Sequence, residues 1–472
     1  MPFILLFLAL IIAPFIHAME EVPFQKNDSI YISEIVIKGN KRTQNQIILR
    51  ELEFSVGDSF IVSDLDIILK KSSENLRNTS LFNFIDIVQD IDTSSLTLKI
   101  QVNLIERWYI LPYFAIKSAE ENINSWWDQK NIKHLSLAMT VVDNNFRGMR
   151  EELILKTNIG YDRSLGLTYS MPYVNKKKTL GVMIGGEYGA YKEMIRGIAD
   201  YKYCFYRSSE NLVLTKYSAA IGILWRPLFR TTQQLNLEYH NASFSDEVLA
   251  LNTNLIPNSK ISYLRIYSKL KIDHRNNKAY PTEGSYADFI ITQTGLGLLS
   301  GEKSMQSSFQ TNVRFYQALN KRLFWASGLH GVIAKNAAKT EYFGQEIGNY
   351  DNEMRAFENY RIPFKEAFIS KNNFKIQIIP KKVKKIPFLK TETLSLIHYT
   401  VYLNAFFDLA YVKPDWQRNP LLEKRALTSN FLYSSGVGLD VVTYYDMVFR
   451  FECSRNFEFN NWGFFVHLRT SI

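Results

Sequence analysis

The chain has 472 residues, of which 46% are hydrophobic and 14% are aromatic, and its formal net charge is +10. Outside the N-terminus there is no run of about 18 apolar residues, which excludes a membrane-spanning helix there. The chain could cross a bilayer only as a closed β-barrel. The 27 Tyr and 32 Phe suit the aromatic girdles of such a barrel, although an all-β soluble protein is also compatible with them.

The excess of positive charge does not indicate nucleic acid, because the basic residues are scattered along the chain instead of gathered in one patch. Anionic lipid headgroups or lipopolysaccharide phosphates are the expected counter-charges. Lys176-Lys177-Lys178 is one candidate contact, and the alternative is a solvated loop tip. The two cysteines provide no disulfide framework, and their context suggests no metal.

The N-terminus has the outline of a secretory leader. A short apolar stretch covers residues 3–16, and Ala18 is a plausible small residue before the cleavage point. No Lys or Arg precedes the stretch, and Ile16 stands where a small residue is usual. We expect residues 1–18 to be a signal peptide, since the stretch is too short to span a bilayer comfortably.

Residues 30–105 predict a small α+β domain. A strand over 32–38 is followed by a helix to about Leu52, for which Thr43 and Gln46 form a capping box. Ser63 is expected to cap a second helix, in which four apolar residues recur at helical spacing: Leu65, Ile68, Leu69 and Leu76. Two strands, over 84–91 and 96–105, complete the unit.

This order of elements resembles a POTRA domain. The resemblance is carried by Gly39-Asn40-Lys41-Arg42-Thr43 at the first turn and by Leu81-Phe82 before the second strand. A POTRA domain offers an exposed sheet edge, to which an extended client or partner segment can add a strand. A spacer with no client is the alternative.

From residue 133 onward the chain alternates between apolar and polar residues, as barrel strands do. We expect residues 106–132 to be a junction and residues 133–472 to be a barrel of about 16 antiparallel strands. Its expected strand starts are Lys133, Glu151, Ser164, Thr179, Asp200, Lys216, Thr232, Ser262, Gly284, Ser304, Leu323, Phe364, His398, Tyr433, Met447 and Trp462. An even number of strands places both ends of the barrel on one side of the membrane.

The polar stretch 273–284 joins two alternating segments and predicts a hairpin end. Its pattern resembles the periplasmic turn of the BamA/TamA outer-membrane assembly barrels, and the matching residues are Asp273, Arg275, Pro281, Thr282 and Gly284. Residues 144–148, Asn-Asn-Phe-Arg-Gly, resemble the first extracellular loop of the same family. Parity places residues 336–363 outside, between the eleventh and twelfth strands.

That long loop contains Met354-Arg355-Ala356-Phe357, which resembles the V-R-G-F/Y loop signature of the family, with Ala in place of Gly. The resemblance implies that Arg355 and Phe357 enter the lumen and that Asp408 holds the arginine. The family has a second carboxylate on the preceding strand, where this chain has Gln377 on the lumen side. Asp408 alone would equally suit an ordinary solvated lumen residue.

The sequence carries no catalytic motif, and we expect no enzyme activity, cofactor or metal. The resemblance implies an outer-membrane protein with its N-terminal domain in the periplasm. It would assemble or insert unfolded outer-membrane or secreted client proteins through a lateral seam between its first and last strands. Periplasmic or lipoprotein partners and outer-membrane lipid are further expected contacts. The alternatives are a dedicated secretion pore of the two-partner type and a passive structural or diffusion barrel.

Overall fold

The structure is a computed structural model. It describes residues 29–92, 95–118, 135–208, 211–251, 259–299, 302, 306–336, 345–348, 352–385, 396–415, 427 and 429–468. The expected signal peptide, residues 1–18, and most of the expected junction lie outside this part of the chain. Among the helices of these residues, none combines the length and the apolar character that crossing a bilayer requires.

The N-terminal domain is the predicted α+β unit. Its elements are β1 (Ser29–Lys38), α2 (Asn45–Arg50), β2 (Ser59–Ile61), α3 (Val62–Arg77), β3 (Phe82–Asp92) and β4 (Thr97–Glu106). The sheet order is β2-β1-β4-β3, with β1 and β4 parallel and both outer pairs antiparallel. Both helices bury apolar residues against this sheet, among them Ile48 and Leu76, both fully buried. In the strand order, β3 is one of the two edge strands of the sheet.

The expected helix caps are wrong. Gln44 precedes α2 and Ile61 precedes α3, and neither position has a side-chain cap. The Thr43 hydroxyl lies 2.8 Å from the Tyr109 hydroxyl and accepts a hydrogen bond from Asn145, so a tertiary contact has replaced the cap. Ser63 lies inside α3.

The rest of the described chain is mostly one barrel. Its strands are β5 (Ile110–Ser118), β6 (Leu135–Phe146), β7 (Glu151–Gly160), β8 (Arg163–Met171), β9 (Leu180–Tyr191), β12 (Leu214–Leu228), β13 (Thr231–Phe244), β14 (Lys260–Asp273), β15 (Gly284–Thr294), β16 (Gln306–Ala318), β17 (Leu323–Asn336), β18 (Gln345–Ile347), β19 (Ile362–Lys385), β20 (Leu396–Pro414), β21 (Phe431–Thr443), β22 (Val448–Asn456) and β23 (Asn461–His467). Strand β18 is a three-residue piece that pairs with β19 beyond the end of β17. The other sixteen strands go once around the barrel, which confirms the predicted fold class.

The expected strands contain two errors, one strand that was missed and one that is not part of the barrel. The first barrel strand is β5, which lies within the expected junction and pairs with β6. The segment near Asp200 instead forms the separate hairpin β10 (Glu193–Ala199) and β11 (Lys202–Arg207). One strand is gained and one is lost, so β14 and β15 are still the eighth and ninth strands. The short helices α5 (Asp246–Leu251) and η4 (Tyr444–Asp446) lie between barrel strands.

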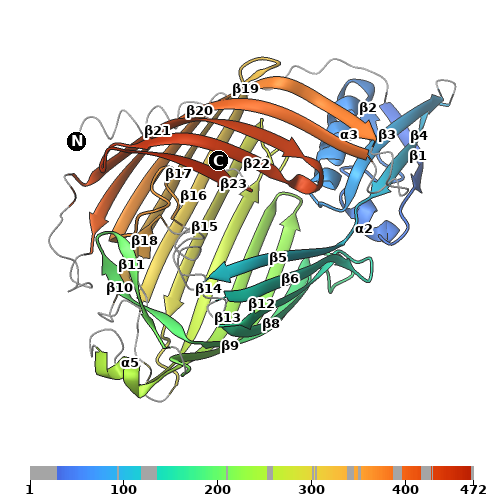
Figure 1. Cartoon of the computed structure of the whole chain (residues 1–472). Helices are drawn as coiled ribbons and strands as arrows, with labels where there is room; N and C mark the ends of the chain where they lie inside the picture. Colours follow the sequence, from blue (N-terminus) through green and yellow to red (C-terminus); the bar gives the residue numbers. More distant parts are fainter. Residues whose placement is uncertain are drawn as a thin grey trace.

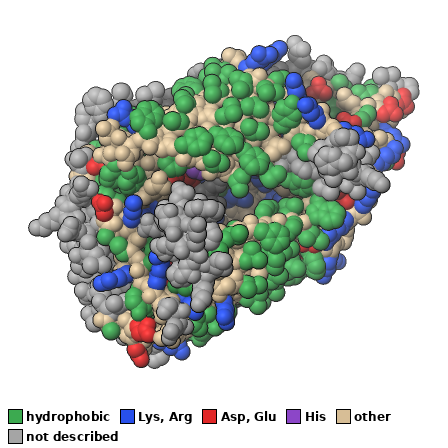
Figure 2. Space-filling model, in the orientation of Figure 1, with side chains coloured by type: hydrophobic (Ala, Val, Ile, Leu, Met, Phe, Trp, Pro, Cys, Tyr) green, Lys and Arg blue, Asp and Glu red, His purple; other side chains and the backbone are tan. Residues whose placement is uncertain are grey.

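The strands have an apolar outer face and a polar inner face. On β19, Phe374 and Ile376 are 52% and 47% exposed, whereas Asn373 and Lys375, which alternate with them, are fully buried. Figure 2 shows hydrophobic side chains spread over the outside of the barrel, on both sides of a hollow. The N-terminal domain, blue in Figure 1, lies across one end of the barrel.

Candidate functional site

The loop between β17 and β19 turns into the barrel. Met354, Arg355 and Phe357 are all fully buried, although they belong to a loop outside the strands. Ala356 has a φ of 67°, in the left-handed region that favours glycine. The backbone at this position therefore has the shape that the glycine of the resembling loop signature would adopt without strain.

Arg355 and Asp408 are in contact inside the barrel. Arg355 Nε donates to Asp408 Oδ2 at 2.8 Å, and Nη2 donates to Oδ1. The guanidinium also lies 3.8 Å from the centre of the Phe406 ring, and Nη2 donates to the Asn372 carbonyl at 3.2 Å. A buried bidentate pair of this kind fixes position strongly, because separating the partners would leave a charge buried alone.

Gln377 makes no hydrogen bond to the described part of this loop. It pairs with Tyr402 across the sheet, whereas Asp408 pairs with Lys371, so Gln377 lies nearer the N-terminal domain. Its amide donates to the Tyr402 hydroxyl at 3.3 Å. The expectation that position 377 shares the tether is therefore wrong for this geometry, and Lys371 occupies the strand position opposite the aspartate.

The inserted loop is also attached to the last hairpin, β22–β23. Asn456 Nδ2 donates to the Ala356 carbonyl at 3.1 Å, and Asn461 Nδ2 donates to the Tyr360 hydroxyl at 2.7 Å. The Tyr360 and Phe459 rings are stacked, with centroids 4.1 Å apart. Through these contacts one loop links β20 to the two strands that end the barrel.

The 273–284 turn is held by its own polar residues. Asp273 accepts two hydrogen bonds from the Arg275 guanidinium, each 2.8 Å long. Asn276 and Thr282 bond across the turn, with Asn276 Nδ2 donating to Thr282 Oγ1 at 2.8 Å. A Cβ on Gly284 would lie 2.2 Å from the His274 carbonyl oxygen, and its φ is 100°, so a larger residue would not fit. Pro281 follows a buried tyrosine in the same turn.

That tyrosine, Tyr280, reaches into the lumen. Its hydroxyl donates to Asp440 at 2.8 Å, and Asp440 also accepts two hydrogen bonds from Arg450, at 2.6 and 2.8 Å. The Lys375 ammonium lies 4.6 Å from the centre of the Tyr280 ring. Sequence reasoning missed this second charged cluster, because its four members are single residues on four different elements.

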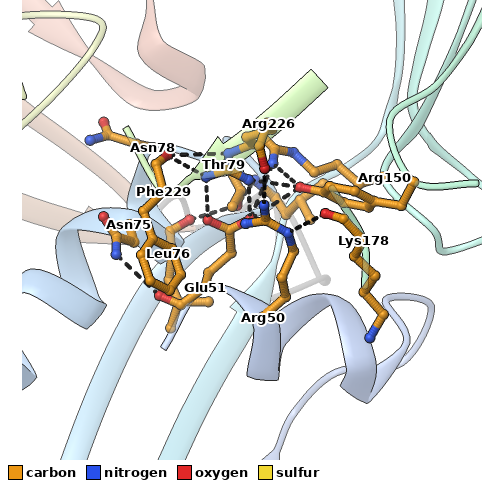
Figure 3. A network of polar contacts seen from close by, with 12 residues as sticks. Arg50, Glu51, Asn75, Leu76, Asn78, Thr79, Arg150, Lys178, Arg226 and Phe229 are labelled. Atoms are coloured by element: carbon orange, nitrogen blue, oxygen red, sulfur yellow. Dashed lines mark hydrogen bonds and ion pairs between the residues drawn. The ribbon is translucent and has the colours of Figure 1, made fainter. Parts of the chain in front are cut away.

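The N-terminal domain is joined to the barrel by a buried network around Glu51 (Figure 3). Arg226 donates to both carboxylate oxygens, at 2.6 and 2.8 Å, and Arg150 and the Tyr173 hydroxyl reach Oε1 at 3.3 and 3.2 Å. Burial by itself would raise the pKa of Glu51, but the charge and hydrogen bonds of Arg226, with Arg150 and Arg50, lower it to about 2. Glu51 is therefore an anion when the domain is docked.

Further contacts reach the turns at the same end of the barrel. Gln44 N–H donates to the Gly148 carbonyl at 3.0 Å, Lys278 Nζ donates to the Asn78 carbonyl at 2.7 Å, and Arg107 Nη1 lies 2.6 Å from Asp446. A cavity of about 330 Å³ lies beside this interface and is lined from both sides. The docked domain therefore covers part of the barrel mouth.

These contacts correct two expectations. Residues 144–148 do not form an outer loop, because Asn145 and Gly148 touch the N-terminal domain. Lys178 is not simply a solvated loop tip, since its Nζ donates to the Gln46 carbonyl at 2.9 Å. Lys176 and Lys177 beside it are exposed, so they remain available as candidate headgroup contacts.

The barrel closes between β23 and β5, which are neighbours in the strand order. Neighbouring strands in this order are hydrogen-bonded, so the pair β23–β5 completes the ring. Side chains on both strands are well exposed, including Ile116 at 75% and Phe464 at 69%. Pro112 in β5 lacks a backbone donor, and proline is typical of sheet edges. We call this line of closure the seam.

Comparison with known families agrees with this architecture. Residues 145–370 match the Omp85 superfamily domain, and residues 30–104 match the POTRA family described as surface antigen variable number repeat. The chain belongs to the Omp85 superfamily. This confirms the resemblance drawn from the sequence, and it places the protein in the outer membrane with its POTRA domain in the periplasm. Members of the Omp85 superfamily are protein transport and assembly factors that work on client proteins.

Solved Omp85 structures are similar at low identity. BamA from Haemophilus ducreyi lacking POTRA domains 1–3 is 16% identical, with a TM-score of 0.49, over 93% of this chain and 83% of that one. CdiB from Acinetobacter baumannii is 12% identical, with a TM-score of 0.48, over 93% and 74%. CdiB from Escherichia coli is 10% identical, with a TM-score of 0.47, over 96% and 91%. The comparison with curated proteins gives no match.

Proposed function

We propose that this Omp85 protein assembles or inserts β-rich client proteins by opening its seam. The observation that carries the proposal is the seam itself. Strands β23 and β5, the last and the first strands of the barrel, close it, and β5 contains Pro112, which has no backbone N–H to donate. An unpaired strand edge in lipid is costly, so an opened seam would bind a client strand and close again by exchange.

The inserted loop supports this proposal, because it touches the strands next to the seam. Arg355 is held by Asp408 on β20, and residues 356 and 360 bond to Asn456 and Asn461 of the last hairpin. The loop would therefore keep β22 and β23 in position while β5 separates from them. In this view Arg355, Phe357 and Asp408 form a positioning site for the moving hairpin.

The POTRA domain would supply the client. Its edge strand β3 ends the sheet order and exposes Val88 and Ile91 at 45% and 37%. An extended segment can pair with such an edge through backbone hydrogen bonds. Cross-linking at β3 in cells, followed by recovery of the bound protein, tests this part of the proposal.

A disulfide across the seam tests the mechanism. Cysteines would be scanned in pairs along β5 and β23 after Cys204 and Cys453 are replaced by serine. Cys204 lies in the separate β10–β11 hairpin and Cys453 on β22. The locked protein should fail to assemble clients until a reductant is added.

Full client assembly by a completely cross-linked sample would contradict the proposal. The second candidate, a secretion pore of the two-partner type, should keep its secretion activity when the seam is locked. A passive barrel should likewise keep its conductance. The covered barrel mouth at Glu51 bears on the pore candidate, since a substrate passing through the lumen would first have to displace the POTRA domain.

A further inference from the structure

Three side chains that can bind metals converge inside the barrel beside the seam. The donor atoms of Glu353, Glu358 and His467 all lie within 4.8 Å of one another. The two glutamates belong to the inserted loop, whereas His467 is on β23, the last strand. The Glu358 carboxylate is 3.7 Å from His467 Nε2. Two elements that are far apart in the sequence therefore bring carboxylate and imidazole ligands to one point.

Two carboxyl groups in this region, those of Glu358 and Glu452, have no hydrogen-bond partner for their oxygens. Both carboxylate oxygens of Glu358 are buried without a hydrogen bond. Glu452, on the neighbouring strand β22, is fully buried, and neither of its oxygens has a hydrogen-bond partner. Burying a carboxylate in this way costs several kcal/mol unless a cation or a proton compensates it. Glu452 lies near enough to act electrostatically on Glu358.

The nearby cations do not balance these carboxylates. Arg355 and Arg450 both act on Glu452, but each is already paired, with Asp408 and Asp440 respectively. Lys371 is the cation that acts most on Glu358. Local negative charge is therefore left over around the Glu358 and Glu452 carboxylates.

We propose that Glu353, Glu358 and His467 bind one divalent cation of the zinc class. Imidazole nitrogen with carboxylate oxygens is a donor set that zinc and similar transition metals accept, while magnesium prefers oxygen alone. Glu452, fully buried on β22, adds a further carboxylate in this part of the barrel. The metal joins the inserted loop to β23, next to the seam.

If the seam opens as proposed above, this metal would oppose the opening by fixing the last strand to the loop. Binding itself does not depend on that function. The two proposals can therefore fail separately. Metal titration of the purified chain tests metal binding, and the seam disulfide tests seam opening.

The test is a zinc titration of the purified full-length protein in detergent, after removal of bound metal with a chelator. Isothermal calorimetry should show one equivalent bound, and the barrel should unfold at a higher temperature with zinc. Magnesium should bind at least about tenfold more weakly, because it is a poor partner for imidazole. Absence of zinc binding, or equal binding of magnesium, would overturn the proposal.

Two substitutions test whether Glu358 and His467 bind the metal or only support the structure. Glu358→Gln should weaken zinc binding at least about tenfold, yet raise the unfolding temperature of the metal-free protein, because it removes an uncompensated buried carboxyl. His467→Asn should weaken binding similarly. The control is Glu366→Gln, which removes a surface carboxylate paired with Lys413 and should bind zinc like the original protein. Unchanged zinc affinity in Glu358→Gln would exclude the site.

Discussion

Replacing Glu51 by Gln should release the POTRA domain from the barrel. Arg226 bonds both oxygens of this carboxylate, and only 1% of the Glu51 side chain is exposed. Removing one partner of a buried ion pair costs about 3 to 5 kcal/mol. The pKa gives a consistent figure, since a fall from 4.5 to about 2 corresponds to about 3 kcal/mol of preference for the docked carboxylate. The docking equilibrium should therefore weaken by at least about 100-fold.

The effect can be measured as a distance. Spin labels at exposed Lys71 on the POTRA domain and Lys321 on a barrel turn, in a protein without its two native cysteines, would give one narrow distance distribution when the domain is docked. Glu51→Gln should broaden this distribution and lengthen its mean. Glu34→Gln is the matched control, because the Glu34–Lys99 pair is about half exposed and such pairs contribute little.

Acid should reproduce the effect of the mutation. The pKa of Glu51 is lowered by docking, so its contribution is complete above its ordinary value of 4.5 and is lost as the pH falls towards 2. The original protein should undock over that window, and Glu51→Gln should show no further change there. An unchanged distance distribution in Glu51→Gln at neutral pH would refute the reasoning.

Three other outcomes are expected. Arg355→Ala and Asp408→Asn should each reduce client assembly while the barrel remains heat-modifiable, and the double variant should be no worse than the single ones; additive losses would argue against the tether. Deleting residues 30–105 should leave an inserted barrel that no longer supports its client, and failure to insert would show that the two parts do not fold independently. Ala356→Gly should relieve a left-handed backbone and stabilise the folded loop by about 1 kcal/mol, measured as a higher unfolding temperature; a lower one would contradict this.

Much of the fold could be predicted because alternation is a local property. In β19 each residue already shows whether it faces lipid or lumen, and the same holds for Asp408 in β20. Reasoning from alternation failed where a strand outside the barrel has the same alternating pattern as a barrel strand. Hairpin β10–β11 alternates like a barrel strand. Strand β5 begins just after the aromatic pair Trp108-Tyr109, in the stretch that was expected to be a junction.

The interface could not be predicted for a different reason. Glu51 lies 175 residues from Arg226 and 99 from Arg150, and none of the three belongs to a recognisable motif. Thr43 has the sequence context of a helix cap, but its hydroxyl faces Tyr109 and Asn145 in the assembled molecule. Such contacts depend on how two folded units meet, which no short window of sequence contains.

The 273–284 turn contacts the POTRA domain and the barrel lumen at the same time. Lys278 donates a hydrogen bond to the carbonyl of Asn78 at the end of α3. Two residues later, Tyr280 donates a hydrogen bond to Asp440 in the lumen. Because these two contacts are only two residues apart in one turn, a movement of the POTRA domain would be passed to the Tyr280 contact. If a bound client tilts the POTRA domain, either the Lys278–Asn78 hydrogen bond breaks or Tyr280 moves away from the Asp440–Arg450 pair. In the second case, client binding in the periplasm would change the contacts inside the barrel.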